Sequence, residues 1–168
     1  VGQVLNASIN RSPSAYLNNP AEERAQYDYN TDKNMTLLRI AKKASADAED
    51  AEGLGFFNWF AVHPTSMNNT NLYVSGDNKG YASYLTERKI NGPTSSGVRP
   101  GEGSFVAAYA STNLGDVSPN ILGPHCQNTG KPCDFNTSTC DGTSNPPVTL
   151  VPYACCGILK CSFEVHLA

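Results

Sequence analysis

A run of seven residues, FFNWFAV at positions 56–62, restricts the possible folds of this chain more than any other stretch. Aromatic and aliphatic residues in a short, nearly continuous run are typical of a strand buried in a sheet. A second such run, FVAAYAS, lies at 105–111, and the stretch DNKGYASYLTERK at 77–89 has the features of a helix. A strand, a helix and a strand in this order predict an α/β fold, in which a mixed sheet has flanking helices.

Two helix starts are expected from the residues that precede them. The helix at 77–89 should have Asp77 as its N-cap, and a shorter helix at 19–27 should have Asn19 as its N-cap. The remaining predictions are strands at 1–10 and 34–42 and loops at 11–20, 64–76, 91–104 and 113–122. A charged, alanine-rich stretch at 42–55 forms either a helical turn or a solvated excursion.

The composition excludes several classes of protein. Hydrophobic residues make up 39% of the 168 residues and charged residues 16%, which fits a globular protein. The net charge of −3 gives no reason to expect a nucleic-acid partner. No apolar stretch reaches the ~20 residues that a membrane-spanning helix needs.

All six cysteines lie beyond residue 125. An even number of clustered cysteines predicts a disulfide-containing C-terminal loop region, although many pairings are possible. No C-x-x-C pair supports a structural zinc site. The cysteines point to the secretory pathway, with the chain on the extracellular or lumenal side of the cell surface. Five N-x-S/T sequons, which are candidate glycosylation sites, favour the same compartment: Asn6, Asn10, Asn34, Asn68 and Asn136.

Reactive side chains follow both buried strands. His63 comes directly after the first, where a core histidine bonded to a backbone partner and a catalytic or metal-binding histidine are about equally compatible with its position. Asp116 and Ser118 lie after the second, between a glycine and a proline. They form either a turn in which both side chains bond to nearby backbone, or an active-site loop. Because functional groups gather at strand ends in α/β folds, we expect one shared site.

Arg11 lies where the first predicted strand gives way to a proline-containing loop. A guanidinium group suits forked hydrogen bonding to an oxygen. The alternative is an ordinary surface arginine.

Four blocks of sequence resemble the neutral ceramidase family. They are INRSPSAYLNNPAEERAQY at 9–27, FNWFAVHPTSMNNTN at 57–71, SGDNKGYASYL at 75–85 and FVAAYASTNLGDVSPNILGPHCQNTGKPC at 105–133. The blocks are long, and their order is that of the family. The resemblance implies a zinc-dependent amidase that converts ceramide, an N-acylsphingosine, into sphingosine and a fatty acid, with the membrane surface as the source of substrate.

The resemblance also implies roles for single residues. His63 corresponds to a zinc-binding histidine, and Ser118 to a serine that acts as nucleophile or orients the substrate. Asp116 corresponds to an aspartate that holds substrate hydroxyls beside the Zn²⁺ cofactor, and Arg11 to an active-site arginine. Zinc polarises a carbonyl and lowers the pKa of its water to about 7. Whether Ser118 or that water attacks stays open.

Members of this family are longer than this chain. The resemblance implies that the other zinc ligands, a histidine upstream and a glutamate and a tyrosine downstream, lie outside it. We therefore expect residues 1–141 to be a segment of a larger catalytic domain and the isolated chain to be inactive. We expect residues 142–168 to be a divergent tail, either mis-spliced or disordered, or else a strand pair with local disulfides. The resemblance also implies a Cys126–Cys140 disulfide, which leaves Cys133 without its usual partner.

Two other functions are compatible with the sequence. One is a non-catalytic secreted product that binds lipid or a protein partner. The other is a serine hydrolase independent of metal, which needs a general base near Ser118.

Overall fold

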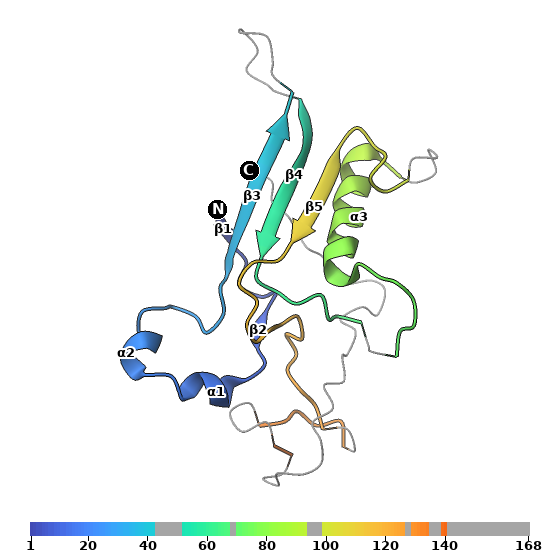
Figure 1. Ribbon diagram of the computed structural model, residues 1–168. Coiled ribbons are helices and arrows are strands. Elements are labelled where there is room, and N and C mark those ends of the chain that lie inside the picture. The colour runs from blue at the N-terminus through green and yellow to red at the C-terminus, as the bar shows by residue number, and fades with distance from the viewer. Residues whose placement is uncertain (43–51, 68–69, 94–98, 127–128, 135–138, 141–168) are drawn as a thin grey trace.

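The computed structural model describes residues 1–42, 52–67, 70–93, 99–126, 129–134 and 139–140. Its centre is a four-stranded sheet in the order β1–β3–β4–β5 (Figure 1). Strand β4 is antiparallel to β3 and parallel to β5, so the predicted mixed sheet is confirmed. The strands are β1 (Gly2–Gln3), β3 (Asn34–Ala41), β4 (Gly53–Phe60) and β5 (Val106–Ala110).

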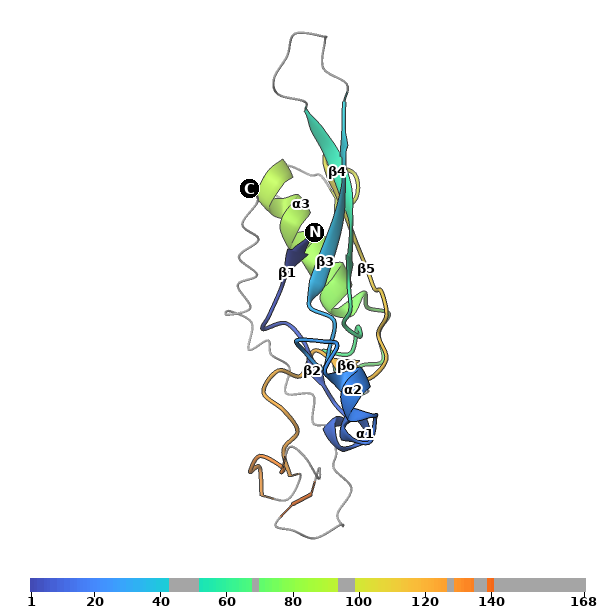
Figure 2. The same ribbon diagram turned by 90° about the vertical axis from the view of Figure 1, so that its left-hand side faces the viewer.

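One helix, α3 (Asp77–Asn91), connects the two parallel strands. Figure 2 views the sheet nearly edge-on and shows α3 on one of its faces. On β4, the buried Phe56 makes edge-to-face contacts with Phe105 and Tyr109, with ring centroids 5.8 and 5.4 Å apart. Aromatic packing therefore joins the two parallel strands on the buried face.

The other face of the sheet carries exposed apolar side chains. Leu38 on β3 is paired with Phe57 on β4, which is paired with Ala108 on β5. The residues Leu38 and Phe57 are 55% and 45% exposed. No helix among the described residues is long and apolar enough to cross a membrane.

A second, two-stranded sheet lies beyond the end of β4. It pairs β2 (Ile9–Asn10) with β6 (Val117–Ser118) in antiparallel register. A small core of Phe60, Val62 and Val117 connects this sheet to the end of β4. The functional residues expected from the sequence therefore lie at the end of the main sheet remote from the connection between β3 and β4 (Figure 1).

The N-terminal predictions need correction. Residues 1–10 form two short strands, β1 and β2, rather than one. The predicted loop at 11–20 contains a helix, α1 (Pro13–Leu17), whose first residue is a proline with a φ suited to helix starts. The following helix, α2 (Ala21–Arg24), is shorter than expected, and Pro20 rather than Asn19 occupies its N-cap position.

Boundaries of the central elements also differ. Strand β4 ends at Phe60 because the chain turns sharply there, and Val62 N donates to Phe60 O at 3.0 Å. Helix α3 has Gly76 at its N-cap position, so the prediction that Asp77 caps it is wrong. The predicted tail at 142–168 and residues 43–51 of the stretch at 42–55 lie outside the described residues. Residues 53–55 of that stretch are the start of β4, so the strand begins earlier than predicted.

Candidate active site

The pairing of β2 with β6 brings together residues about a hundred positions apart in the sequence. Ile9 is paired with Ser118, and immediately beyond this ladder Arg11 N donates to Asp116 O at 2.9 Å. Gly115 makes the preceding turn with a φ of +45°, a conformation that favours glycine. Backbone bonds thus place Arg11 beside the 116–118 segment independently of its side chain.

His63 is attached to the same segment. Its Nδ1 lies 2.7 Å from the carbonyl oxygen of Val117, the residue between Asp116 and Ser118. A carbonyl oxygen only accepts hydrogen bonds, so Nδ1 carries the proton and donates. In the neutral imidazole Nε2 is then the unprotonated nitrogen and can donate its lone pair to a metal, which is the arrangement common among metal-binding histidines.

This contact accounts for both interpretations of His63. The imidazole is bonded to a backbone partner, as expected of a core histidine, but its ring is half-buried rather than enclosed. A core role alone needs no open nitrogen. The geometry therefore fits a metal ligand, and a backbone carbonyl orients it.

Ser118 is buried, with 9% of its surface exposed. Its Oγ accepts a hydrogen bond from Asn120 N at 3.1 Å. The turn interpretation is thus right for the backbone contact of this hydroxyl. Because Oγ is the acceptor in that bond, its hydrogen stays available for donation to a substrate.

Asp116 does not bond to the turn backbone through its carboxylate. Its Oδ1 accepts from Arg11 Nε at 3.3 Å, and the two side chains are 46% and 49% exposed. It is the one side-chain contact of this pair within the described ranges, where the terminal nitrogens of Arg11 and the second oxygen of Asp116 stay open to a ligand. The pair has the polarity to bind a carbonyl oxygen and a hydroxyl side by side.

Two residues of this region were missed by sequence reasoning. Asn78 and Lys79, in the first turn of α3, bond to backbone carbonyls of the segments that end β4 and β5. Burial away from water lowers the pKa of Lys79 to about 8. Their only sequence signal is position, since both belong to the SGDNKGYASYL block and look like solvent-facing helical residues.

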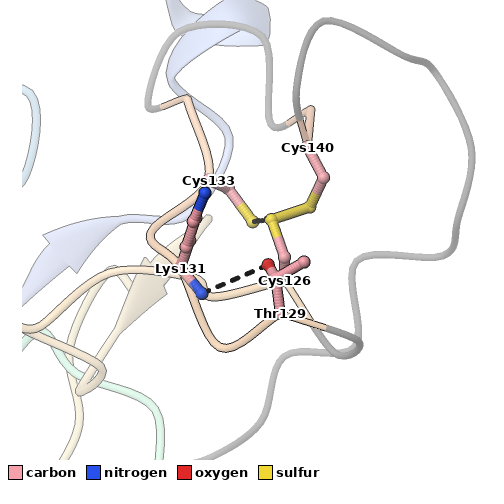
Figure 3. Close-up of a disulfide and its surroundings, with 5 residues drawn as sticks. All are labelled: Cys126, Thr129, Lys131, Cys133 and Cys140. Atoms are coloured by element: carbon pink, nitrogen blue, oxygen red, sulfur yellow. Dashed lines mark hydrogen bonds between the residues drawn. A yellow bond between two sulfur atoms is a disulfide. The ribbon is translucent and has the colours of Figure 1, made fainter.

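The residues described here do not complete a zinc site. His63 fits as one ligand, but the only close group of three potential ligand side chains in the described ranges is Cys126, Cys133 and Cys140. Two of those cysteines form the predicted Cys126–Cys140 disulfide, which is confirmed (Figure 3). The Cys133 thiol lies buried beside it, with its sulfur 3.7 and 3.6 Å from the two bonded sulfurs.

The sequons differ in exposure. Asn6 and Asn34 are exposed, and Asn68 and Asn136 lie outside the described residues. Asn10 is buried, and its amide nitrogen donates to Asn30 O at 3.3 Å. A glycan needs this nitrogen on the surface, so the folded chain is incompatible with glycosylation at Asn10.

Comparison with known proteins matches residues 1–157 to the family of neutral/alkaline non-lysosomal ceramidases, in its N-terminal domain. Neutral ceramidase B of Dictyostelium discoideum is 54% identical over 153 residues, which cover 90% of this chain and 20% of that protein. Neutral ceramidase of Drosophila melanogaster is 56% identical over 137 residues, covering 82% of this chain and 18% of that protein. The chain therefore spans about a fifth of the length of these relatives.

Solved structures show the same fold. A ceramidase complexed with C2 is 39% identical and aligns with a TM-score of 0.56 over 72% of this chain and 16% of its own. The neutral ceramidase from Pseudomonas aeruginosa is 37% identical, with a TM-score of 0.54 over 81% of this chain and 18% of its own. The α/β architecture predicted from the sequence agrees with both.

Proposed function

This chain belongs to the neutral/alkaline non-lysosomal ceramidase family, and on that basis we propose that it is part of a zinc-dependent ceramidase. The complete enzyme would hydrolyse the N-acyl amide of ceramide to sphingosine and a fatty acid. The observation that supports this most is the convergence on one segment, residues 116–118, of a histidine with an open nitrogen and an arginine. Amide hydrolysis needs such groups together, because the carbonyl must be polarised while its neighbouring oxygens are held.

His63 would hold zinc through Nε2, with its tautomer set by the Val117 carbonyl. When bound, zinc supplies a Lewis acid that polarises the amide carbonyl. The protein supplies the orientation, because the ring is tethered to the same strand that carries Ser118.

Ser118 would donate its hydroxyl hydrogen to the substrate. Within the described part of the chain its Oγ has one partner, Asn120 N, and no side-chain base is bonded to it. A serine nucleophile needs an adjacent base. The arrangement therefore favours a substrate-orienting role for Ser118 over direct attack.

Arg11 and Asp116 would bind the polar end of the substrate. The terminal nitrogens of Arg11 suit a developing negative charge on the amide oxygen, and the second oxygen of Asp116 suits a hydroxyl. Because Arg11 Nε bonds to Asp116 Oδ1, each side chain holds the other in place.

The sheet supports the proposal that this chain is one segment of a larger catalytic domain, inactive alone. Exposed apolar residues such as Leu38 and Phe57 form a sheet face that no described element covers. An apolar face of this kind is normally buried by further structure. The remaining zinc ligands would come from the polypeptide that completes the domain. The boundary of the segment was expected at residue 141, and the family match continues to residue 157.

We also propose that the enzyme acts in the secretory pathway, at the lumenal or extracellular side of a membrane that supplies ceramide. A buried disulfide supports an oxidising compartment. The exposed Asn6 and Asn34 are the described sequons available for glycosylation.

The experiment that tests the function uses the complete enzyme carrying this segment and a short-chain N-acylsphingosine. Release of sphingosine and fatty acid should stop on chelation and return with zinc, and His63→Ala should lose bound zinc. Turnover that survives chelation would support the metal-independent serine hydrolase. Lipid binding without turnover would support the non-catalytic alternative. The isolated 168-residue chain should show no turnover.

A further inference from the structure

Side chains in the first turn of α3 form hydrogen bonds to the backbone of the segment that carries His63. Three consecutive residues, Asp77, Asn78 and Lys79, direct their side chains at main-chain groups of that segment or of the strand ends beside it. We call these three residues the α3 clamp. Side chains at a helix start more often bond within their own helix.

Asn78 makes the contact nearest to His63. Its Nδ2 donates to the carbonyl oxygen of His63 at 2.9 Å and to Ser66 Oγ at 3.0 Å. Its Oδ1 is buried and has no partner among the described residues. All the hydrogen bonds of the Asn78 side chain in the described structure therefore go to residues of the 63–67 segment.

Asp77 holds the next part of the same segment. Its two carboxylate oxygens accept from Ser66 N and Met67 N, each at 2.8 Å. Asp77 itself has a φ of +51°, in the left-handed region that few residues other than glycine and asparagine or aspartate adopt. A conformation of this kind persists where surrounding contacts impose it.

Lys79 ties together the ends of the two parallel strands. Its Nζ donates to Phe60 O at 2.8 Å and to Ala110 O at 3.0 Å. Phe60 and Ala110 are the last residues of β4 and β5. His63 follows the end of β4, and the 116–118 segment follows the end of β5. By bonding to both strand ends, Lys79 fixes the distance between the points from which these two segments start.

We propose that Asn78, supported by Asp77 and Lys79, is a positioning residue for the His63 imidazole. The proposal rests on the proposed role of His63 as a zinc ligand. His63 has three tethers in the described structure: its ring and its backbone N–H both donate to Val117 O, at 2.7 and 3.4 Å, and its carbonyl accepts from Asn78. With the carbonyl released, the backbone turns more freely, and Nε2 no longer keeps one direction.

Asn91 provides a matched control within the same helix. It lies at the other end of α3, and its amide bonds to the main chain of Phe105, donating to the oxygen at 2.8 Å and accepting from the nitrogen at 3.0 Å. Asn91→Ala therefore removes the same kind of helix-to-backbone tether away from His63. Asn78→Ala and Asn91→Ala should lower thermal stability to a similar degree.

The test compares these two variants in the complete, zinc-loaded enzyme. We expect Asn78→Ala to weaken zinc binding about tenfold, as removal of partners that orient metal ligands does, and to lower kcat more than it raises KM. We expect Asn91→Ala to leave zinc affinity within about twofold of the unmodified enzyme, since the lost bonds lie away from the ligand. Equal zinc affinity in all three proteins, or equal loss in both variants, would overturn the proposal.

A second readout separates this proposal from the proposed function. The Nδ1 proton of His63, bonded to Val117 O, should give a downfield nuclear magnetic resonance signal with or without metal. Asn78→Ala should broaden or shift that signal, and Asn91→Ala should retain it. If the unmodified enzyme binds no zinc, the proposed function fails. An undisturbed signal in Asn78→Ala would overturn the positioning role.

Discussion

Replacing the side chains of Arg11 and Asp116 should affect activity much more than stability. The two side chains are 49% and 46% exposed and share one contact of 3.3 Å. Exposed pairs of this kind contribute roughly 0.2–1 kcal/mol to the free energy of unfolding. The backbone bond from Arg11 N to Asp116 O does not depend on either side chain and stays in place when they are replaced.

Asp116→Asn and Arg11→Gln should therefore leave the fold almost unchanged. If the two groups hold the substrate, each replacement should lower kcat/KM by about 10², similar to the loss of one oxyanion donor. A hundredfold loss corresponds to about 2.7 kcal/mol in the transition state. The expected effect on activity is thus several times the expected effect on stability.

A double-mutant cycle in the complete enzyme measures both quantities. Unfolding free energies of the single and double variants give the coupling of the pair, and kcat/KM gives its effect on the reaction. Because each side chain orients the other, the losses in activity should be less than additive. A stability coupling above about 2 kcal/mol would refute the reasoning, since the pair would then be structural. A kcat/KM within threefold of that of the unmodified enzyme would refute the proposed binding of substrate by this pair.

Three further predictions concern the surrounding structure. Glu87→Gln should cost about 2–4 kcal/mol of unfolding free energy in urea denaturation, because the buried carboxylate accepts two backbone N–H groups at 2.6 and 3.0 Å. Burial lowers the pKa of Lys79 from 10.5 to about 8, so the contribution of Lys79 to the free energy of unfolding is lowest below pH 8 and rises toward pH 10.5. The difference in unfolding free energy between the unmodified protein and Lys79→Met should show this rise, and a difference that stays constant with pH would contradict it. Cys133→Ser should prevent rearrangement of the neighbouring disulfide at alkaline pH, because thiol–disulfide exchange needs a thiolate beside the bond. Peptide mapping under non-reducing conditions should detect disulfide isomers in the unmodified protein and none in the variant.

The main elements of the fold were predictable because their signals are local. The apolar runs at 34–42, 56–62 and 105–111 became β3, β4 and β5, and the helical stretch at 77–89 became α3. Each of these elements is long enough to show a pattern of its own. The two-residue strands β2 and β6 are too short for that, and they exist through pairing with each other.

Asp77 shows where a local rule fails. An aspartate before a helical stretch predicts an N-cap, since its carboxylate can accept the first free N–H groups of the helix. In the structure this carboxylate also accepts from Ser66 N and Met67 N, ten or more residues earlier in the chain. The sequence shows that the residue is an acceptor at a helix start, but not which segment lies against it.

The convergence of the candidate site could be predicted in outline, because His63 and Ser118 each follow an apolar strand and functional groups gather at strand ends in α/β folds. The contact that joins them could not, because it is made by the carbonyl of Val117. Every residue has such a carbonyl, so the side chain at 117 shows nothing of this role, and its own contribution is to the core with Phe60 and Val62. Substitution at this position would therefore test packing and leave the acceptor in place. The orientation of His63 has to be tested through neighbours whose side chains can be removed. In the part of the chain that the structure describes, Asn78 is the residue whose side chain bonds to the main chain of His63.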